Sequence, residues 1–136
     1  MDGLATRLRD LIEEHLALGA PEGVQDQPVW FRSGSAAVYL RLLSGTPPML
    51  RVFSPILREV DETPQLLHEL NEINAAVASV RLFWRGDTVY VATEHLAATL
   101  DPEELVAACD TVAAVADHYD DLLLGQFGGV LSYEDS

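Results

Sequence analysis

The sequence contains no lysine, so its basic side chains are eight arginines and four histidines. Against them stand 22 aspartates and glutamates, which give a formal net charge of −14 at pH 7. Binding to a nucleic acid backbone depends on clustered Lys and Arg side chains that displace condensed counterions, and anionic membranes attract polybasic segments. The composition therefore argues against nucleic acid and membrane surfaces as partners.

Cysteine is almost absent as well. The single cysteine, Cys109, cannot form an intramolecular disulfide, and one chain cannot supply a thiolate metal cluster. Cys109 falls on the apolar stripe of the last predicted helix, where burial would raise the pKa of its thiol and suppress its reactivity. We expect a structural cysteine.

Long apolar runs are missing too: no stretch approaches the roughly 20 apolar residues that a membrane helix requires. The first residues, MDGLATRLRDLIEEH, carry acids within their apolar periodicity and lack the basic start and apolar run of a signal peptide. With 136 residues, the length favours one domain. We expect a cytoplasmic protein with a single domain over residues 1–124 and a loose C-terminal tail over residues 125–136.

Motifs of catalysis and cofactor binding are also absent. The histidines match no metal-ligand spacing, no serine lies in a GxSxG motif, and the glycine-rich segments lack the Lys and Ser/Thr of a phosphate loop. His118 lies one helical turn from Asp121, a spacing typical of a surface pair. We therefore expect no enzyme activity, no catalytic residues, no cofactor and no metal.

The first half of the chain predicts one helix and three strands. Apolar residues recur at helical spacing over residues 3–18, and Gly and Pro mark a loop over residues 19–28. Three β-prone segments then begin at residues 29, 36 and 49, separated by turn residues. Pro55, inside the third segment, cannot donate a ladder hydrogen bond and indicates an edge strand or a bulge.

The second half begins with another helix and a hairpin. The helix opens at Thr63–Pro64, with the proline at its first helical position. After it, residues 80–85 and 88–94 carry period-2 patterns on either side of Gly86–Asp87, a pair suited to a two-residue turn. This arrangement predicts a tight β-hairpin.

A last helix closes the pattern. Asp101 is suited to its N-cap, Glu104 completes a capping box, and Gly125 is the predicted end. The order is therefore αβββαββα, which predicts an α+β fold with an antiparallel sheet packed against helices.

The second helix contains two asparagines, Asn71 and Asn74, although asparagine competes for the backbone and is a poor residue for a helix interior. They flank the apolar stripe of Leu70 and Ile73, at the border between core and solvent. There an amide can bond free backbone groups of a neighbouring loop or strand. We predict a structural role for both asparagines.

The segment LNEINAAVASVRLFWRGDTVYVATEHLAATLDPEELVAACDTVAAVADHYDDLL resembles the YbjN family and its actinobacterial relatives, described as YbjN and type III secretion chaperone-like peptide-binding domains. The matching pieces, within residues 63–124, are the LNxxN helix, the hairpin, the LDPEEL helix opening and a final helix with acidic positions. The resemblance implies a secretion-chaperone-like fold of the CesT kind: small, acidic, often dimeric and non-enzymatic. In such chaperones, partner segments bind as extended chains along helix and sheet surfaces.

A peptide-binding groove needs exposed apolar pockets and an available strand edge. Candidate contact residues come from the faces that remain once each element has buried its core side: Trp30, Tyr39, Leu43, Phe53, Phe83 and Tyr90. Each of these could instead belong to the core beneath a helix. The same apolar surface could also form the interface of a homodimer.

The prediction is therefore a cytoplasmic, non-enzymatic domain that binds a protein or peptide client and forms a homodimer. The alternative is a small-molecule-binding regulatory domain or cryptic enzyme whose pocket contains a His and carboxylate pair such as His118 with Asp121. An enclosed cavity with convergent polar groups would favour that alternative, whereas an open apolar surface favours peptide binding.

Overall fold

The structure, a computed structural model, describes residues 29–33 and 36–131. The helix predicted over residues 3–18 lies outside them. The elements, in chain order, are β1 (Val29–Ser33), β2 (Ala36–Leu43), β3 (Met49–Arg58), α2 (Pro64–Ala76), β4 (Arg81–Arg85), β5 (Thr88–Leu96), α3 (Pro102–Phe127) and β6 (Val130–Leu131). From β1 to α3 this is the predicted order, and the α+β fold is confirmed.

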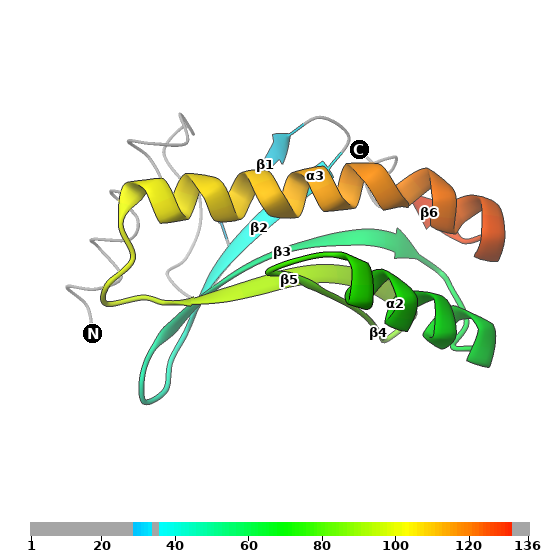
Figure 1. The fold of residues 1–136 in the computed structure, drawn as a ribbon, viewed down its shortest axis with the longest axis horizontal. Helices are drawn as coiled ribbons and strands as arrows, with labels where there is room; N and C mark the ends of the chain where they lie inside the picture. Colours follow the sequence, from blue (N-terminus) through cyan, green and yellow to red (C-terminus); the bar gives the residue numbers. More distant parts are fainter. Residues whose placement is uncertain (1–28, 34–35, 132–136) are drawn as a thin grey trace.

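The strands form one antiparallel sheet in the order β1-β2-β3-β5-β4, and β6 pairs with the far end of β3. Helix α3 runs across one face of this sheet, and α2 lies next to β4 (Figure 1). We call the face that packs against α3 the inner face, and the opposite one the outer face.

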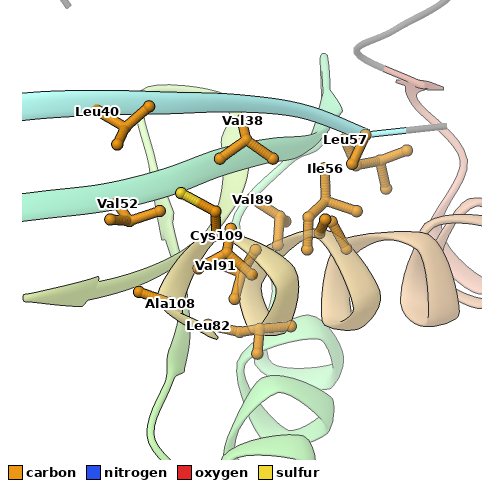
Figure 2. Packing of buried hydrophobic residues seen from close by; sticks show 14 of the residues in the cluster. Val38, Leu40, Val52, Ile56, Leu57, Leu82, Val89, Val91, Ala108 and Cys109 are labelled. Carbon is orange, nitrogen blue, oxygen red and sulfur yellow. The ribbon is translucent and has the colours of Figure 1, made fainter. Parts of the chain in front are cut away.

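Side-chain alternation along each strand separates the two faces. In β2, Val38 and Leu40 are buried while Tyr39 between them is half-buried, and the same alternation continues along β3. The buried side chains from β2, β3, β4 and β5 form one core with residues of α2 and α3 (Figure 2). Most of the partly exposed side chains of β2, β3, β4 and β5 lie on the outer face.

Strand β3 lies in the middle of the sheet, and its register with β5 shifts between Pro55 and Leu57. Of the two alternatives for Pro55, an edge strand or a bulge, the bulge is therefore correct. The extra residue allows the consecutive side chains of Ile56 and Leu57 both to be buried. A bulge interrupts the ladder of hydrogen bonds, so the sheet does not need the backbone N–H that proline lacks.

The predicted hairpin joins β4 to β5 through Gly86 and Asp87, whose φ angles of 56° and 71° are both positive. Positive φ at both central positions is the geometry of the turn that matches the twist of a two-stranded ribbon. The turn sets Leu82 opposite Val91, and both side chains are buried in the core.

Both helices begin where the sequence predicts. The Thr63 hydroxyl oxygen accepts a hydrogen bond from Leu66 N at 3.1 Å. At the start of α3, Asp101 Oδ1 accepts from Glu104 N at 2.8 Å, and Glu104 Oε1 accepts from Asp101 N at 3.1 Å. These contacts satisfy backbone donors that have no partner within a helix.

The end of α3 differs from the prediction. The helix does not stop at Gly125 but continues to Phe127, and it ends at Gly128, whose N–H donates to Leu124 O at 2.9 Å. Next, Val130–Leu131 pairs with β3, and Leu131 is buried. The predicted loose tail is therefore wrong for residues 125–131, while residues 132–136 lie outside the described part.

The physical reason lies in the three glycines near this point. Gly125 is not among the glycines with a positive φ, so the helix continues through it. At Gly128 and Gly129 the φ angles are 74° and 89°, which glycine adopts without steric cost. The positive φ ends the helix, and it does so three residues after the first glycine that could have ended it.

These glycines give a matched pair of substitutions. In Gly129→Ala the added Cβ would lie 2.6 Å from Arg58 O and 2.7 Å from a Val60 methyl carbon, so we expect a loss of stability larger than about 1 kcal/mol. Gly125→Ala, in an open helical position, should instead gain roughly 0.5–1 kcal/mol. Urea unfolding measures both. Equal stability of the two variants would contradict the docking of β6 on β3.

Cys109 is 2 % exposed, and its sulfur is directed toward β2 and β3 (Figure 2). Burial, with a smaller contribution from Asp110, raises the pKa of the thiol from 9.0 to about 12. The predicted structural role agrees with this environment, because the nucleophilic thiolate is disfavoured.

The raised pKa makes stability depend on pH. Between pH 9 and pH 12 the unfolded chain releases the Cys109 proton while the folded chain keeps it, so this group destabilises the fold as pH rises through that window. We expect Cys109→Ala to lose less stability than the wild type between pH 8 and pH 10.5 in urea unfolding. Parallel pH profiles for the two proteins would contradict the burial of the thiol.

Candidate functional site

Four aromatic side chains form a continuous band across the outer face. They are Tyr39 from β2, Phe53 from β3, Tyr90 from β5 and Phe83 from β4. The ring centroids are 5.4 Å apart for Tyr39 and Phe53, 6.4 Å for Phe53 and Tyr90, and 5.4 Å for Tyr90 and Phe83. We call these four residues the aromatic stripe.

The strand register explains why the rings meet. Tyr39 lies directly opposite Phe53, and Phe83 directly opposite Tyr90. The residue opposite Phe53 on β5 is Ala92, whose small side chain leaves room for Phe53 to reach Tyr90 diagonally. Cross-strand aromatic pairs of this kind stabilise a sheet. All four rings are only partly buried, so the stripe also offers apolar surface to solvent.

The six predicted contact residues thus fall into three groups. Four of them are the aromatic stripe. Leu43 lies on the outer face at the other end of β2, opposite Met49, which is itself opposite Leu96. These three residues form a second apolar band, the aliphatic stripe, in which Leu96 is 49 % exposed. Trp30 occupies the position of β1 opposite Tyr39, and its side chain lies outside the described part.

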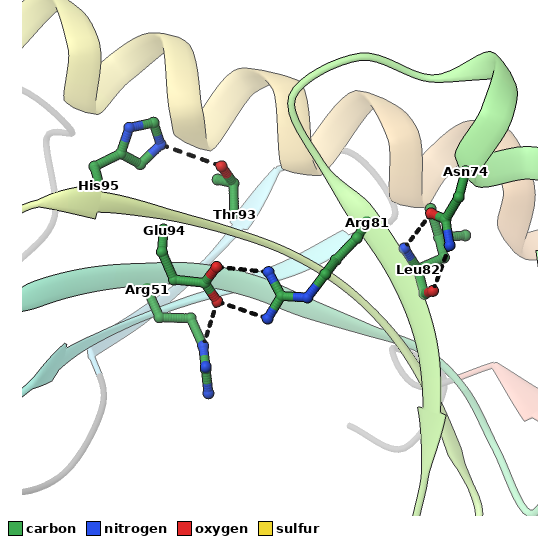
Figure 3. A network of polar contacts seen from close by, with 7 residues as sticks. All are labelled: Arg51, Asn74, Arg81, Leu82, Thr93, Glu94 and His95. Atoms are coloured by element: carbon green, nitrogen blue, oxygen red, sulfur yellow. Dashed lines mark hydrogen bonds and ion pairs between the residues drawn. The ribbon is translucent and has the colours of Figure 1, made fainter. Parts of the chain in front are cut away.

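Between the two apolar stripes runs a charged one, made of Arg41, Arg51, Glu94 and Arg81. Glu94 accepts hydrogen bonds from Arg51 Nε at 2.7 Å and from both terminal nitrogens of Arg81, one of them at 2.8 Å (Figure 3). The Arg81 guanidinium carbon also lies 5.4 Å from the centroid of the Phe83 ring. Arg81 therefore contacts both the charged stripe and the aromatic stripe.

Hydrogen bonding from Arg81, followed by that from Arg51, holds the pKa of Glu94 below its ordinary value. Glu94 therefore remains a carboxylate at neutral pH, and its stabilising contribution is lost only as pH falls below its ordinary pKa of 4.5. The charged stripe is not among the predicted contact residues, because those were selected for apolar side chains. The signal was present, since Arg41, Arg51 and Arg81 each lie two residues from a chosen aromatic residue on the same strand.

Asn74 closes part of the β4 edge of the sheet. Its Oδ1 accepts from Leu82 N at 2.7 Å, and its Nδ2 donates to Leu82 O at 2.9 Å (Figure 3). The amide thus bonds one residue of β4 as a neighbouring strand would. Exposed edges invite pairing with other chains, and covering them is a common protection. Asn71 is exposed on α2 and makes no such contact with the described residues.

The opposite end of the hairpin is also fixed to the segment between β3 and α2. Trp84 Nε1 donates to Val60 O at 2.7 Å, and Val60 N donates to Asp87 O at 3.0 Å. Asn74 and Val60 therefore hold the β4–β5 hairpin, which carries half of the aromatic stripe, at two separate points.

The predicted alternative requires a polar pocket around His118 and Asp121. Both side chains are exposed on α3. A cavity of about 200 Å³ lies between β5 and α3, lined in part by Thr93, His95 and Glu104, which is smaller than the roughly 300–1,000 Å³ of typical ligand pockets. A second hollow, of about 480 Å³ and more open to solvent, lies between α2 and the end of α3 and is lined by Pro64, Gln65, His68, Glu69, Gln126 and Phe127. Neither His118 nor Asp121 lines either of them. The geometry does not favour the small-molecule alternative.

Within residues 29–33 and 36–131, no three His, Cys, Asp or Glu side chains lie close enough together to hold a metal ion. No helix in the same part of the chain is both long and apolar enough to cross a membrane.

Substituting Asn74 tests the closure of the edge. In Asn74→Asp the side chain keeps its size and still accepts from Leu82 N, but it has no proton to donate to Leu82 O, so we expect a loss of about 1–3 kcal/mol. Asn71→Asp, an exposed change in the same helix, should cost less than about 0.5 kcal/mol. Urea unfolding compares the two. If both variants lose the same stability, the Asn74 amide does not hold β4.

Three of the solved structures that are similar to this chain are protein–protein complexes. The crystal structure of the ExsC–ExsE complex matches with a TM-score of 0.70 and 15% identity, over 88% of this chain and 96% of the other. The HopA1–SchA chaperone–effector complex matches with a TM-score of 0.67 and 11% identity, over 87% and 94%. The Yersinia pestis type III secretion chaperone SycH, bound to a fragment of YscM2, matches with a TM-score of 0.61 and 12% identity, over 85% and 98%.

At these identities the likeness shows the fold alone. No curated protein matches the chain by sequence. A family model, however, matches residues 2–135, and its description agrees with the predicted resemblance. The chain belongs to the family of T3SS (YopN, CesT) and YbjN peptide-binding chaperones.

Proposed function

We propose that this chaperone domain binds an extended segment of a protein client on the outer face of its sheet, with the aromatic stripe as the principal contact. The observation that carries the proposal is the stripe itself: four partly exposed rings from four strands form one continuous apolar band. Membership of a peptide-binding family supports a peptide as the ligand. So do the similar solved structures, one of which is a chaperone–effector complex.

The stripe has the properties of a peptide contact. Aromatic side chains offer a large apolar area with few rotatable bonds, so that little conformational entropy is lost on binding. Adjacent strands are about 4.8 Å apart, so a stripe across four strands is roughly 15 Å wide, which is enough to receive an extended chain. Cross-strand stacking holds the rings in place before a client arrives, which lowers the cost of binding.

The β4 edge is a less suitable place for the client. A peptide that added to the sheet there would need the backbone groups of Leu82, and both are bonded to Asn74. Addition at that residue would first have to break two hydrogen bonds. The outer face needs no such rearrangement.

We further infer a homodimer in the cytoplasm, as the family resemblance predicts for the dimer. Leu67 on α2 and Leu122 on α3 are 43 % and 51 % exposed. They provide apolar surface that a second copy could cover on the helical side. A dimer of that kind would leave the outer face open to the client.

A photo-cross-linker placed in the stripe tests the proposal inside the host cell. We expect p-benzoylphenylalanine in place of Phe83 to form covalent adducts with one or a few client proteins, because a similar aromatic ring remains at the contact. The same group in place of Leu122, exposed on α3, is the matched control and should not trap those clients.

Mass spectrometry of the adducts identifies the partners, and light scattering of the same purified proteins gives the oligomeric state. Adducts of Phe83 variants with a second copy of the chain would assign the stripe to a dimer interface and contradict the proposal. Identical adducts at both positions, or none at either, would contradict it as well.

A further inference from the structure

The charged residues are divided between two sides of the molecule. Strands β2, β3, β4 and β5 hold five arginines and a single acid, Glu94. Helix α2 holds two acids and α3 holds six, and neither contains Arg or Lys. A chain with a net charge of −14 therefore keeps a sheet that is locally positive.

On the outer face this positive charge has a defined order. Along β2 the outward positions are Tyr39, Arg41 and Leu43. On β3, running the opposite way, the corresponding partners are Phe53, Arg51 and Met49. Each strand thus presents an aromatic residue, a cation and an aliphatic residue, two residues apart, which is about 6.6–6.8 Å along a strand.

The arginines are available to a ligand to different degrees. Arg41 is exposed. Arg51 bonds Glu94 through Nε, and its terminal nitrogens point away from that carboxylate (Figure 3). Arg81 uses both terminal nitrogens on Glu94. Glu94 therefore pairs with two arginines but engages both terminal nitrogens of Arg81 only. The terminal nitrogens of Arg51 (Figure 3) and the exposed Arg41 side chain are the cations that a ligand can reach.

From this order we infer that the client segment is acidic. Its Asp or Glu side chains would bind Arg41 and Arg51, and apolar residues two positions away on either side would contact the aromatic and aliphatic stripes. An extended peptide lying along the strands has the same two-residue repeat as the surface. Arginine forks bind carboxylates through paired charge-assisted hydrogen bonds. This inference rests on the proposed function and adds the chemistry of its ligand.

Two other occupants fit the outer face less well. A second copy in a two-fold symmetric contact would set this patch against itself and bring arginines toward arginines. A single-stranded nucleic acid could contact the rings and the arginines, but its many phosphates would be repelled by a chain of net charge −14. A short acidic peptide brings few charges, and the helix acids are screened beyond about 8 Å at physiological salt.

The first test is a phage-displayed library of random twelve-residue peptides, selected on the wild type and on Arg41→Gln/Arg51→Gln. Glu72→Gln, an exposed change on α2, is the control, and Tyr90→Asp reports whether binding uses the aromatic stripe. We expect wild-type and control selections to enrich Asp and Glu two residues from apolar side chains. The double arginine variant should lose this enrichment. Arg41→Gln alone, at an exposed position, serves if the double variant does not fold.

The second test uses one selected peptide, labelled with fluorescein, in anisotropy titrations. Replacing its acids by Asn or Gln should weaken binding to the wild type about tenfold in 50 mM salt, and much less in 500 mM salt because of screening. Unchanged affinity after that replacement would overturn the inference. Tighter binding of a labelled twelve-nucleotide single-stranded DNA would also overturn it.

The results also separate the two proposals. Peptides that lose binding to Tyr90→Asp but show no acidic enrichment would leave the proposed surface intact and overturn only its preference for acids. If no selected peptide depends on Tyr90, the proposed surface itself fails.

Discussion

The packing of α3 against one face of the sheet is the contact on which the rest of the structure depends. This helix is 26 residues long, and its buried side chains, among them Leu105, Val112 and Leu123, meet the inward residues of the strands. Because side chains alternate along a strand, the residues on the face opposite the core can differ in type from the buried ones. The arrangement of the outer face is thus a consequence of how the core is formed.

The outer face is unusual because it combines apolar and charged residues in ordered stripes. A solvated sheet face usually carries scattered polar side chains, whereas here the aromatic rings touch one another and Glu94 joins two arginines. Such contacts reduce side-chain motion before any ligand binds. Since ordering side chains costs free energy on association, a surface that is already ordered binds at lower cost.

Local signals in the sequence predict most of the fold, because the relevant partners are a few residues apart. Asp101 and Glu104 are neighbours in one helical turn, and Gly86–Asp87 forms its own turn. The aromatic and charged stripes depend on strand order, register and the bulge after Pro55, which join residues as distant as Arg51 and Glu94. The predicted end of α3 at Gly125 is wrong because the sequence does not distinguish a glycine within a helix from one that ends it; the φ angle does. The sequence identifies each aromatic residue as a candidate, but it does not predict that the rings contact one another.

The family and the site are supported by different kinds of observation. Similar folds persist at identities of 11% to 15%, so the fold alone does not determine which residues contact a client. The evidence for the site is instead the division of charge between helices and sheet in this chain. With no lysine and only eight arginines, random placement among so many acids would seldom leave strands with five arginines and one acid. The acidic client inferred above follows from this division, because Arg41, Arg51 and Arg81 lie between two apolar stripes of a chain that is otherwise negative, and complementary charge favours a ligand of the opposite sign.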